Sequence, residues 1–168
     1  GIDSVKFFTS QGAFVTCIDR RSKEELADDY TILSSLSNSF MLGDVEIPNL
    51  SGFDIIVRSP GISLQSRAFQ DALKRGQEIT SLTKIFFALC QAPIIGVTGT
   101  KGKGTTSSLI YAMVKRSGRT VWLGGNIGTP LLSSIGAIDS SDIVVLELSS
   151  FQLEDLTQSP HIAVILKI

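Results

Sequence analysis

Short apolar runs recur along the chain and predict buried strands that alternate with helices. A helix that closes on glycine and is followed at once by an apolar run occurs three times, with Gly12, Gly76 and Gly118 as the closing residues. Strands that are almost wholly apolar and separated by helices are typical of parallel sheets covered on both faces. The pattern therefore predicts an α/β fold with strands at residues 13–18, 40–42, 54–57, 78–79, 94–97, 120–123, 143–148 and 162–166.

The order of these elements also predicts two domains. A new α/β unit opens directly after residues 91–93, so we place the boundary between residues 92 and 93. Residues 22–49 are polar and weakly periodic, and we expect a poor helix, a short strand and a long connection there. Gly1 falls inside an expected helix and Ile168 ends an expected strand. The chain is therefore expected to be a fragment whose first domain lacks its first strand.

The second domain opens on a glycine-rich loop. Residues 98–106 read TGTKGKGTT and lie between an apolar strand and a helix. Glycines let backbone N–H groups turn toward phosphate oxygens, the helix start adds its positive end, and Lys103 adds a full charge. The alternative is a tight strand-to-helix turn with solvated lysines. Such a turn has no use for three glycines and two lysines gathered at the start of a helix. We predict that this loop binds phosphate groups, through Thr100, Lys101, Gly102, Lys103, Gly104, Thr105 and Thr106.

Polar side chains follow two other expected strands of this domain. Glu147 emerges near the end of strand 143–148, at the sheet edge where ligands of open α/β sheets bind. It is a candidate ligand for a metal ion bound to the phosphates, or an acid that merely ends a strand. Asn126 lies in the glycine-rich run 124–128 and offers both a donor and an acceptor, or belongs to an ordinary turn.

Two loops of the first domain are further candidates. Residues 58–62 read RSPGI and could hold a phosphate group, although a plain turn is the more frequent meaning of such a run. Asp19 ends strand 13–18, where doubly wound folds place an acid that binds ribose or a base. Arg20 and Arg21 follow it, and the alternative for all three is a charged surface loop.

Composition and cysteine spacing exclude several classes of function. The 168 residues carry a formal net charge of −1, which argues against a nucleic-acid-binding domain. Cys17 and Cys90 belong to no CxxC or Cys/His cluster, so we expect buried thiols in a reducing compartment, with no disulfide framework and no zinc site. The apolar runs are far shorter than the roughly 18 residues of a membrane span, and no signal peptide is evident.

Four of these segments together resemble one family. Residues 59–62 (SPGI), 98–106, 124–128 (GGNIG) and 146–154 (LELSSFQLE) are similar to the Mur ligases of peptidoglycan synthesis, and the last two are the most specific. The resemblance extends over essentially the whole chain. It implies a Rossmann-like parallel-sheet N-terminal domain at residues 1–92 that binds a UDP-muramoyl substrate. The start of a P-loop ATPase-type α/β central domain follows at residues 93–168.

The resemblance also implies an activity, ATP-dependent amide bond formation with Mg2+. UDP-N-acetylmuramoyl-L-alanine would be activated as an acyl phosphate and then attacked by D-glutamate, in a step of cell wall biogenesis that bears on cell shape and cell division. The expected protein is a cytoplasmic monomer without nucleic-acid or membrane partners. Residues 100–106 would bind ATP, Lys103 and Glu147 would be catalytic, and Glu147 and Thr105 would hold the metal. The substrate would contact Asp19, Arg20, Arg21, Ser59, Gly61, Asn126, Ser149 and Gln152.

The sequence departs from the family pattern at two positions. Gly104 stands where the family has a Ser or Thr that binds magnesium, so we expect Thr105 or a water molecule to replace that ligand. Lys167 stands where the family has Asn, and His161 is expected to be a surface or capping residue. A nucleotide-binding homologue without ligase activity and a Mur ligase that adds another amino acid remain alternatives. These 168 residues alone are expected to be inactive.

Overall fold

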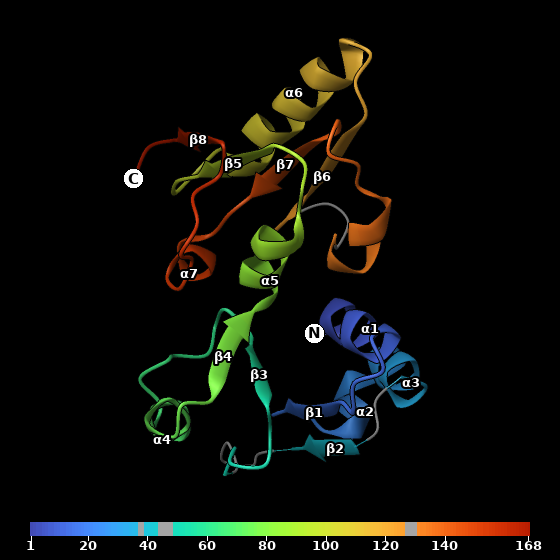
Figure 1. The fold of residues 1–168 in the computed structure, drawn as a ribbon, viewed down its shortest axis with the longest axis vertical. Coiled ribbons are helices and arrows are strands. Elements are labelled where there is room, and N and C mark those ends of the chain that lie inside the picture. Colours follow the sequence, from blue (N-terminus) through green and yellow to red (C-terminus); the bar gives the residue numbers. More distant parts are fainter. Residues whose placement is uncertain (37–38, 44–48, 127–130) are drawn as a thin grey trace. The chain divides into compact units, whose positions relative to one another are not determined.

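The computed structural model describes residues 1–36, 39–43, 49–126 and 131–168. The chain divides into two compact units, which we call unit 1 (Gly1–Thr80) and unit 2 (Ser81–Ile168) (Figure 1). Helix α5 (Leu82–Leu89) therefore belongs to unit 2. The units divide earlier in the chain than residue 92, and the boundary between functional domains at 92/93 stays a prediction.

Unit 1 contains two separate strand pairs. β1 pairs in parallel with β2, with Thr16 opposite Ser39, and β3 pairs with β4. Among the described residues no strand pairing joins the two sheets. The elements are α1 (Ile2–Ser10), β1 (Thr16–Asp19), α2 (Lys23–Leu26), α3 (Asp28–Ser34), β2 (Ser39–Leu42), β3 (Ile55–Arg58), α4 (Arg67–Lys74) and β4 (Glu78–Ser81), whose last residue begins unit 2.

The closing glycines take the backbone conformation that the sequence predicts. Gly12, Gly76 and Gly118 have positive φ angles of 79°, 75° and 85°. After α1, Gly12 N donates to Thr9 O and Ala13 N donates to Phe8 O, which satisfies carbonyls of the last helical turn. Because Ala13 completes this cap, β1 begins at Thr16 and not at residue 13 as the apolar pattern predicted.

The polar segment 22–49 contains more helix than expected. α2 and α3 follow one another closely, where we predicted a single poor helix. A capping box begins α2: Ser22 Oγ accepts from Glu25 N at 3.3 Å, and Ser22 N donates to Glu25 Oε2 at 2.7 Å. The short strand is confirmed as β2 (Ser39–Leu42). Residues 44–48 of the expected long connection lie outside the described residues.

The apolar core of unit 1 gathers around β3. Side chains from β3, α4, β4 and the segment before β3 form one buried cluster, so the second strand pair and its helix fold on each other. Its members are Leu50, Ile56, Phe69, Ala72 and Ile79.

Unit 2 is built on a parallel sheet with strand order β6-β7-β5-β8 (Figure 1). Glu147 lies opposite both Val97 of β5 and Gly125 of β6, so the carboxyl ends of these three strands meet at one sheet edge. The elements after α5 are β5 (Ile94–Thr98), α6 (Lys103–Arg116), β6 (Val121–Gly125), the 3-10 helix η1 (Leu132–Ala137), β7 (Ile143–Glu147), α7 (Ser150–Leu153) and β8 (Ile162–Ile165).

The centre of the sheet is fully buried, because Val97, Val144 and Val145 have no exposed surface. Near its amino-terminal edge, Trp122 Nε1 donates to the buried Asp142 at 2.8 Å, and His161 Nδ1 accepts from Ile94 N at 3.1 Å. His161 thus caps the start of β5, as expected.

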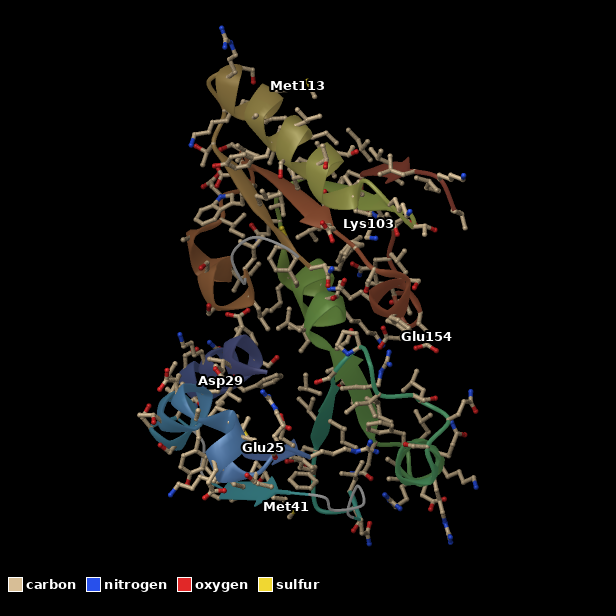
Figure 2. The ribbon with its side chains drawn as sticks, turned by 180° about the vertical axis from the view of Figure 1, so that it is seen from behind. Glu25, Asp29, Met41, Lys103, Met113 and Glu154 are labelled. Atoms are coloured by element: carbon tan, nitrogen blue, oxygen red, sulfur yellow. The ribbon has the colours of Figure 1, made fainter. Side chains whose placement is uncertain are left out.

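Helix α6 packs against β5, β6 and β7, yet part of its apolar surface faces outward. Met113 is 63% exposed (Figure 2). Leu109 is 58% exposed, while Ser107 is fully buried. Cys17 and Cys90 are free thiols and half-buried, and burial raises the pKa of the Cys90 thiol. Within the described part of the chain, no helix is both long enough and apolar enough to cross a bilayer.

Candidate nucleotide and metal site

The glycine-rich loop connects β5 to α6, the context that the sequence predicts. Gly99 and Gly102 have φ angles of +139° and +85°, which a residue with a side chain rarely adopts. Lys103 begins the helix (Figure 2), and its Nζ donates to Gly99 O at 2.8 Å and Thr100 O at 3.3 Å. The ammonium group therefore lies over the loop, close to where backbone N–H groups can hold phosphate oxygens.

The segment that follows β8 fixes the shape of this loop. Leu166 N donates to Thr98 O at 2.9 Å, and Thr100 N donates to Lys167 O at 2.8 Å. A Cβ at Gly99 would lie 2.8 Å from Leu166 Cβ, so only glycine fits there without displacing the chain. Lys167 thus contributes a backbone carbonyl to the loop, a contact that does not depend on which side chain this position carries.

The other predicted ATP-binding residues lie on the loop or the first turn of α6. Thr100, Lys101 and Gly102 are exposed, and Gly104 and Thr106 are half-buried. Thr105 is exposed in the first helical turn, next to the position where Gly104 offers no side chain. Its role as a metal ligand stays a prediction.

Glu147 and Asn126 are brought together at the carboxyl edge of the sheet. Asn126 Nδ2 donates to Glu147 Oε1 at 3.0 Å, and Asn126 N donates to Glu147 O at 2.9 Å. Glu147 is only 4% exposed. Its second oxygen, Oε2, is buried and has no hydrogen-bond partner among the described residues.

Gly125 makes this approach possible. A Cβ at residue 125 would overlap Glu147 O, and the φ angle of Gly125 is +99°. Both the position and the backbone conformation therefore require glycine. Gly128, in the same run, lies outside the described residues.

The geometry of Glu147 fits a magnesium ion. A buried carboxylate oxygen without a partner is costly unless a cation compensates its charge, and carboxylate oxygen is a ligand that Mg2+ prefers. Among the described residues no group of three or more His, Cys, Asp or Glu side chains could hold a metal. One protein carboxylate suffices, however, where phosphates and water complete the coordination.

Ser149 and Gln152 form a helix cap. Gln152 Oε1 accepts from Ser149 N at 2.9 Å, and Ser149 Oγ accepts from Gln152 N at 3.3 Å. Gln152 Nε2 also donates to Thr83 Oγ1 of α5 at 3.2 Å. The predicted substrate contacts of both residues stay predictions. The spacing Ser-x-x-Gln is typical of a capping box, although this cap was not predicted from the sequence.

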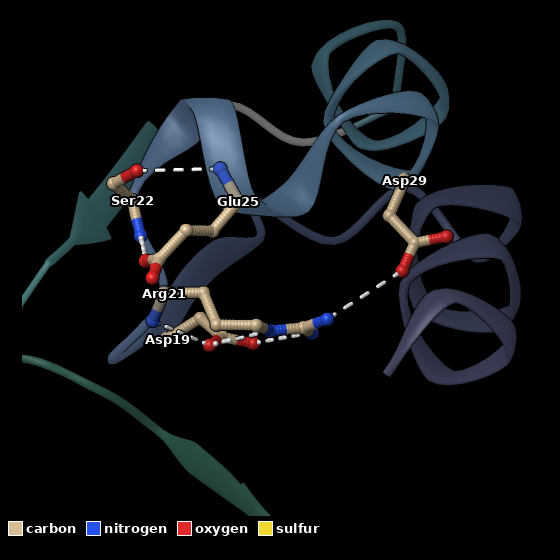
Figure 3. Close-up of polar contacts among 5 residues, drawn as sticks. All are labelled: Asp19, Arg21, Ser22, Glu25 and Asp29. Carbon is tan, nitrogen blue, oxygen red and sulfur yellow. Dashed lines mark hydrogen bonds and ion pairs between the residues drawn. The ribbon is translucent and has the colours of Figure 1, made fainter.

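In unit 1, Asp19 and Arg21 form a bidentate ion pair at the end of β1 (Figure 3). Arg21 Nε and Nη2 donate to the two carboxylate oxygens at 3.2 and 3.0 Å, and Arg21 N donates to Oδ1 at 2.9 Å. The side-chain bond from Arg21 is the main cause that lowers the pKa of Asp19, while Asp19 raises the pKa of Arg21. Arg20 is exposed.

The loop after β3 is held by a side chain that was not among the predicted site residues. Arg58 is 2% exposed, and its Nη1 donates to Ile62 O at 2.7 Å and Pro60 O at 3.3 Å. Ser59 and Gly61 are exposed on this loop. A pocket of about 140 Å³ lies beside it, lined by Thr16, Ile18, Leu50, Phe53, Ile55, Ile56, Val57, Arg58, Ser59, Ile62 and Phe69.

Comparison with known sequences assigns both parts of the chain to one family. Residues 1–81 match the family model of the Mur ligase MurD-like N-terminal domain, and residues 97–168 match that of the Mur ligase middle domain. The chain belongs to the Mur ligase family. The glycine-rich loop and Glu147 lie within the middle-domain match, and Asp19, Arg21 and residues 59–61 lie within the N-terminal match.

Three similar Mur ligases are each named UDP-N-acetylmuramoylalanine--D-glutamate ligase. The protein from Clostridium acetobutylicum is 44% identical over 96% of this chain and 35% of its own length. Those from Acetivibrio thermocellus and Ruminiclostridium cellulolyticum are 43% and 42% identical, over 96% and 99% of this chain and 34% and 36% of their own lengths. The chain thus spans about a third of the length of these relatives.

Proposed function

We propose that this chain is the part of an ATP-dependent ligase that binds UDP-N-acetylmuramoyl-L-alanine and the phosphates of ATP, and that the complete protein joins D-glutamate to this substrate. The observation that carries the proposal is the meeting of the glycine-rich loop, Lys103 and Glu147 at one edge of a parallel sheet. The names of the similar proteins supply the amino acid and its acceptor.

In the proposed reaction the alanine carboxylate of the substrate attacks the γ-phosphorus of ATP, and the bond from γ-phosphorus to the bridging oxygen breaks to release ADP. The amine of D-glutamate then attacks the acyl phosphate, an amide bond forms, and phosphate and the amine proton depart. Lys103 moves from the carbonyls of Gly99 and Thr100 to the phosphate oxygens and neutralises charge there. Glu147 holds Mg2+, which supplies further charge neutralisation when bound.

In unit 1, we propose that the Asp19–Arg21 pair, Arg20, Ser59 and Gly61 contact the uridine diphosphate end of the substrate. The supporting observations are the fixed orientation of the Arg21 guanidinium and the braced loop at residues 59–62. Asn126, Ser149 and Gln152 are proposed to contact the muramoyl-alanine end. The protein is proposed to act as a cytoplasmic monomer.

The test uses the complete protein, ATP, Mg2+ and UDP-N-acetylmuramoyl-L-alanine, with phosphate release as the measured product. We expect release that depends on D-glutamate, and a loss of turnover by a factor on the order of 10³ in Lys103→Ala. Release with another amino acid in place of D-glutamate would identify a different Mur ligase. Binding of ATP without any release of phosphate would identify a nucleotide-binding homologue that is not a ligase.

The departure at Gly104 gives a second test of the metal site. If Thr105 has taken over the missing magnesium ligand, Thr105→Ala raises the Mg2+ concentration needed for half-maximal activity, whereas Gly104→Ser lowers it. Thr105→Ala should then cost little activity when combined with Gly104→Ser. Equal losses in both backgrounds would show that Thr105 is not a ligand.

A further inference from the structure

We infer that Asn126 is a positioning residue for the metal site: it holds the Glu147 carboxylate in the orientation in which Oε2 receives the cation. This inference rests on the proposed function, because it concerns the magnesium ion that Glu147 is proposed to bind. It adds a role for Asn126 that differs from contact with the muramoyl-alanine end of the substrate.

Two contacts hold Asn126 against Glu147. The backbone bond from Asn126 N to Glu147 O places the residue beside the end of β7, and the side-chain bond from Nδ2 reaches Oε1. Gly125 admits the backbone this closely, since any Cβ there would overlap Glu147. The amide is thus placed by the sheet itself, next to the carboxylate in the β6–β7 register.

The two oxygens of Glu147 consequently differ. Oε1 accepts the amide hydrogen bond, whereas Oε2 is buried and has no hydrogen-bond partner among the described residues. A hydrogen bond to one oxygen fixes the plane of a carboxylate and leaves the other oxygen for a metal ion, as groups that orient metal ligands commonly do. An aliphatic residue at position 126 would let the carboxylate rotate and would leave both oxygens without a donor.

The arrangement also limits what Asn126 can offer to a substrate. An asparagine amide has two N–H groups and one carbonyl oxygen. One N–H is used by Glu147, so contact with the muramoyl-alanine end falls to the second N–H and the carbonyl oxygen. Metal binding and substrate binding therefore share one side chain, and a substrate that pulled Asn126 away would also release the carboxylate.

The test measures metal binding and not activity. Mn2+ is titrated into the complete protein, in the presence of a non-hydrolysable ATP analogue, and free Mn2+ is followed by electron paramagnetic resonance. We expect Asn126→Leu, which keeps the side-chain volume but lacks the donor, to weaken Mn2+ binding about 10-fold. Asn126→Ala should do the same, so the test stands if either variant fails to fold. Asn49→Leu, the same chemical change on a turn of unit 1, serves as the matched control.

A double-mutant cycle separates positioning from a merely structural role. If Asn126 acts through Glu147, then Asn126→Leu should cause no further loss of Mn2+ affinity in a Glu147→Ala background. It should also leave binding of the ATP analogue in EDTA unchanged. Equal losses in both backgrounds, or weaker nucleotide binding in EDTA, would overturn the inference.

The outcome also distinguishes this inference from the proposed function. If Glu147→Ala itself leaves Mn2+ binding unchanged, the proposed metal site is wrong. If Glu147→Ala weakens Mn2+ binding and neither Asn126 variant does, only the positioning role is wrong.

Discussion

The two units hold their candidate loops in different ways. In unit 2 the loops at residues 98–102 and 125–126 are held by backbone hydrogen bonds, to the segment that follows β8 and to the end of β7, and glycine permits the close approach. In unit 1 the loop at residues 59–62 is braced by one buried side chain, that of Arg58. The sheets of the two units also differ in how deeply their strands are buried. β7 lies between two strands and is buried, whereas Ile18 of β1 and Ile55 of β3 are 37% and 45% exposed.

This difference indicates that the candidate loops of unit 2 are shaped by strand register, while the candidate loop of unit 1 is shaped by an individual side chain. The shape of a loop held by register tolerates few changes in the backbone, but it does not depend on any one long side chain. The following experiments test this comparison in order of decreasing effect.

The largest effect is expected for Gly125→Ala. The added Cβ would overlap the backbone of Glu147 and force an L-residue into a φ angle of +99°. Strain and overpacking together should lower the free energy of unfolding of unit 2 by about 3 kcal/mol or more. Chemical denaturation, monitored by the hydrogen exchange of amides in residues 81–168, measures this loss of stability. Gly136→Ala is the control, because a Cβ there meets nothing within 4 Å, and an equal loss in both variants would contradict the register argument.

The next prediction concerns the separated sheets of unit 1. Among the described residues β1 pairs only with β2 and β3 only with β4, and side chains of β1 and β3 line the same pocket. We expect a further strand of the complete protein to pair there, because each two-stranded sheet leaves unpaired strand edges among the described residues. Amide exchange in β1 and β3 should then be roughly 100-fold slower in the complete protein than in these 168 residues, because paired edge amides are protected. Unchanged exchange in both strands would count against this strand.

A matched pair of core truncations compares the two sheets directly. Val145 of β7 is fully buried, whereas Val57 of β3 is only half-buried beside the pocket. Val145→Ala should cost about 2 kcal/mol of stability and Val57→Ala less than about 1 kcal/mol, since the latter leaves little new cavity. Urea denaturation of both variants measures the difference. Equal costs would show that the sheets are equally well packed.

The smallest effect is expected for Asp19→Asn. Arg21 lowers the pKa of Asp19 in the folded protein, so the pair adds stability above the carboxyl's unfolded pKa, and this stability is lost as the pH falls through the lowered value. Asp19 is a third exposed, and solvent and salt screen the pair, so the gain at pH 7 should be below about 1 kcal/mol. Thermal unfolding of both proteins should differ at neutral pH and converge in acid. A difference that persisted in acid would rule out the ion pair as its cause.

Local sequence signals predicted much of the fold. The positive φ angles at Gly12, Gly76 and Gly118, the parallel strands of unit 2 and the position of the glycine-rich loop all follow from periodicity and glycine placement. These features depend on residues that are near one another in the chain. The apolar pattern was misleading at Ala13, which it placed in a strand although this residue completes the cap of α1.

Most features that were not predicted from the sequence depend on distant contacts. The bond between Asn126 and Glu147 requires the register of β6 on β7, which brings together residues 21 positions apart in the chain. Arg58 looked like part of a phosphate-binding loop, yet its guanidinium is directed at the carbonyls of its own loop. The cap formed by Ser149 and Gln152 could have been predicted from the sequence, since the spacing Ser-x-x-Gln is typical of a capping box.

The hydrogen bond between Trp122 and Asp142 has a practical consequence. Trp122 is the single tryptophan of the chain, and it lies in β6 of unit 2. Light that excites tryptophan alone will therefore produce emission from unit 2 and none from unit 1. Loss of the indole hydrogen bond and entry of water will change that emission when the sheet opens. The chain thus carries a built-in optical label by which the unfolding of unit 2 can be followed separately from that of unit 1.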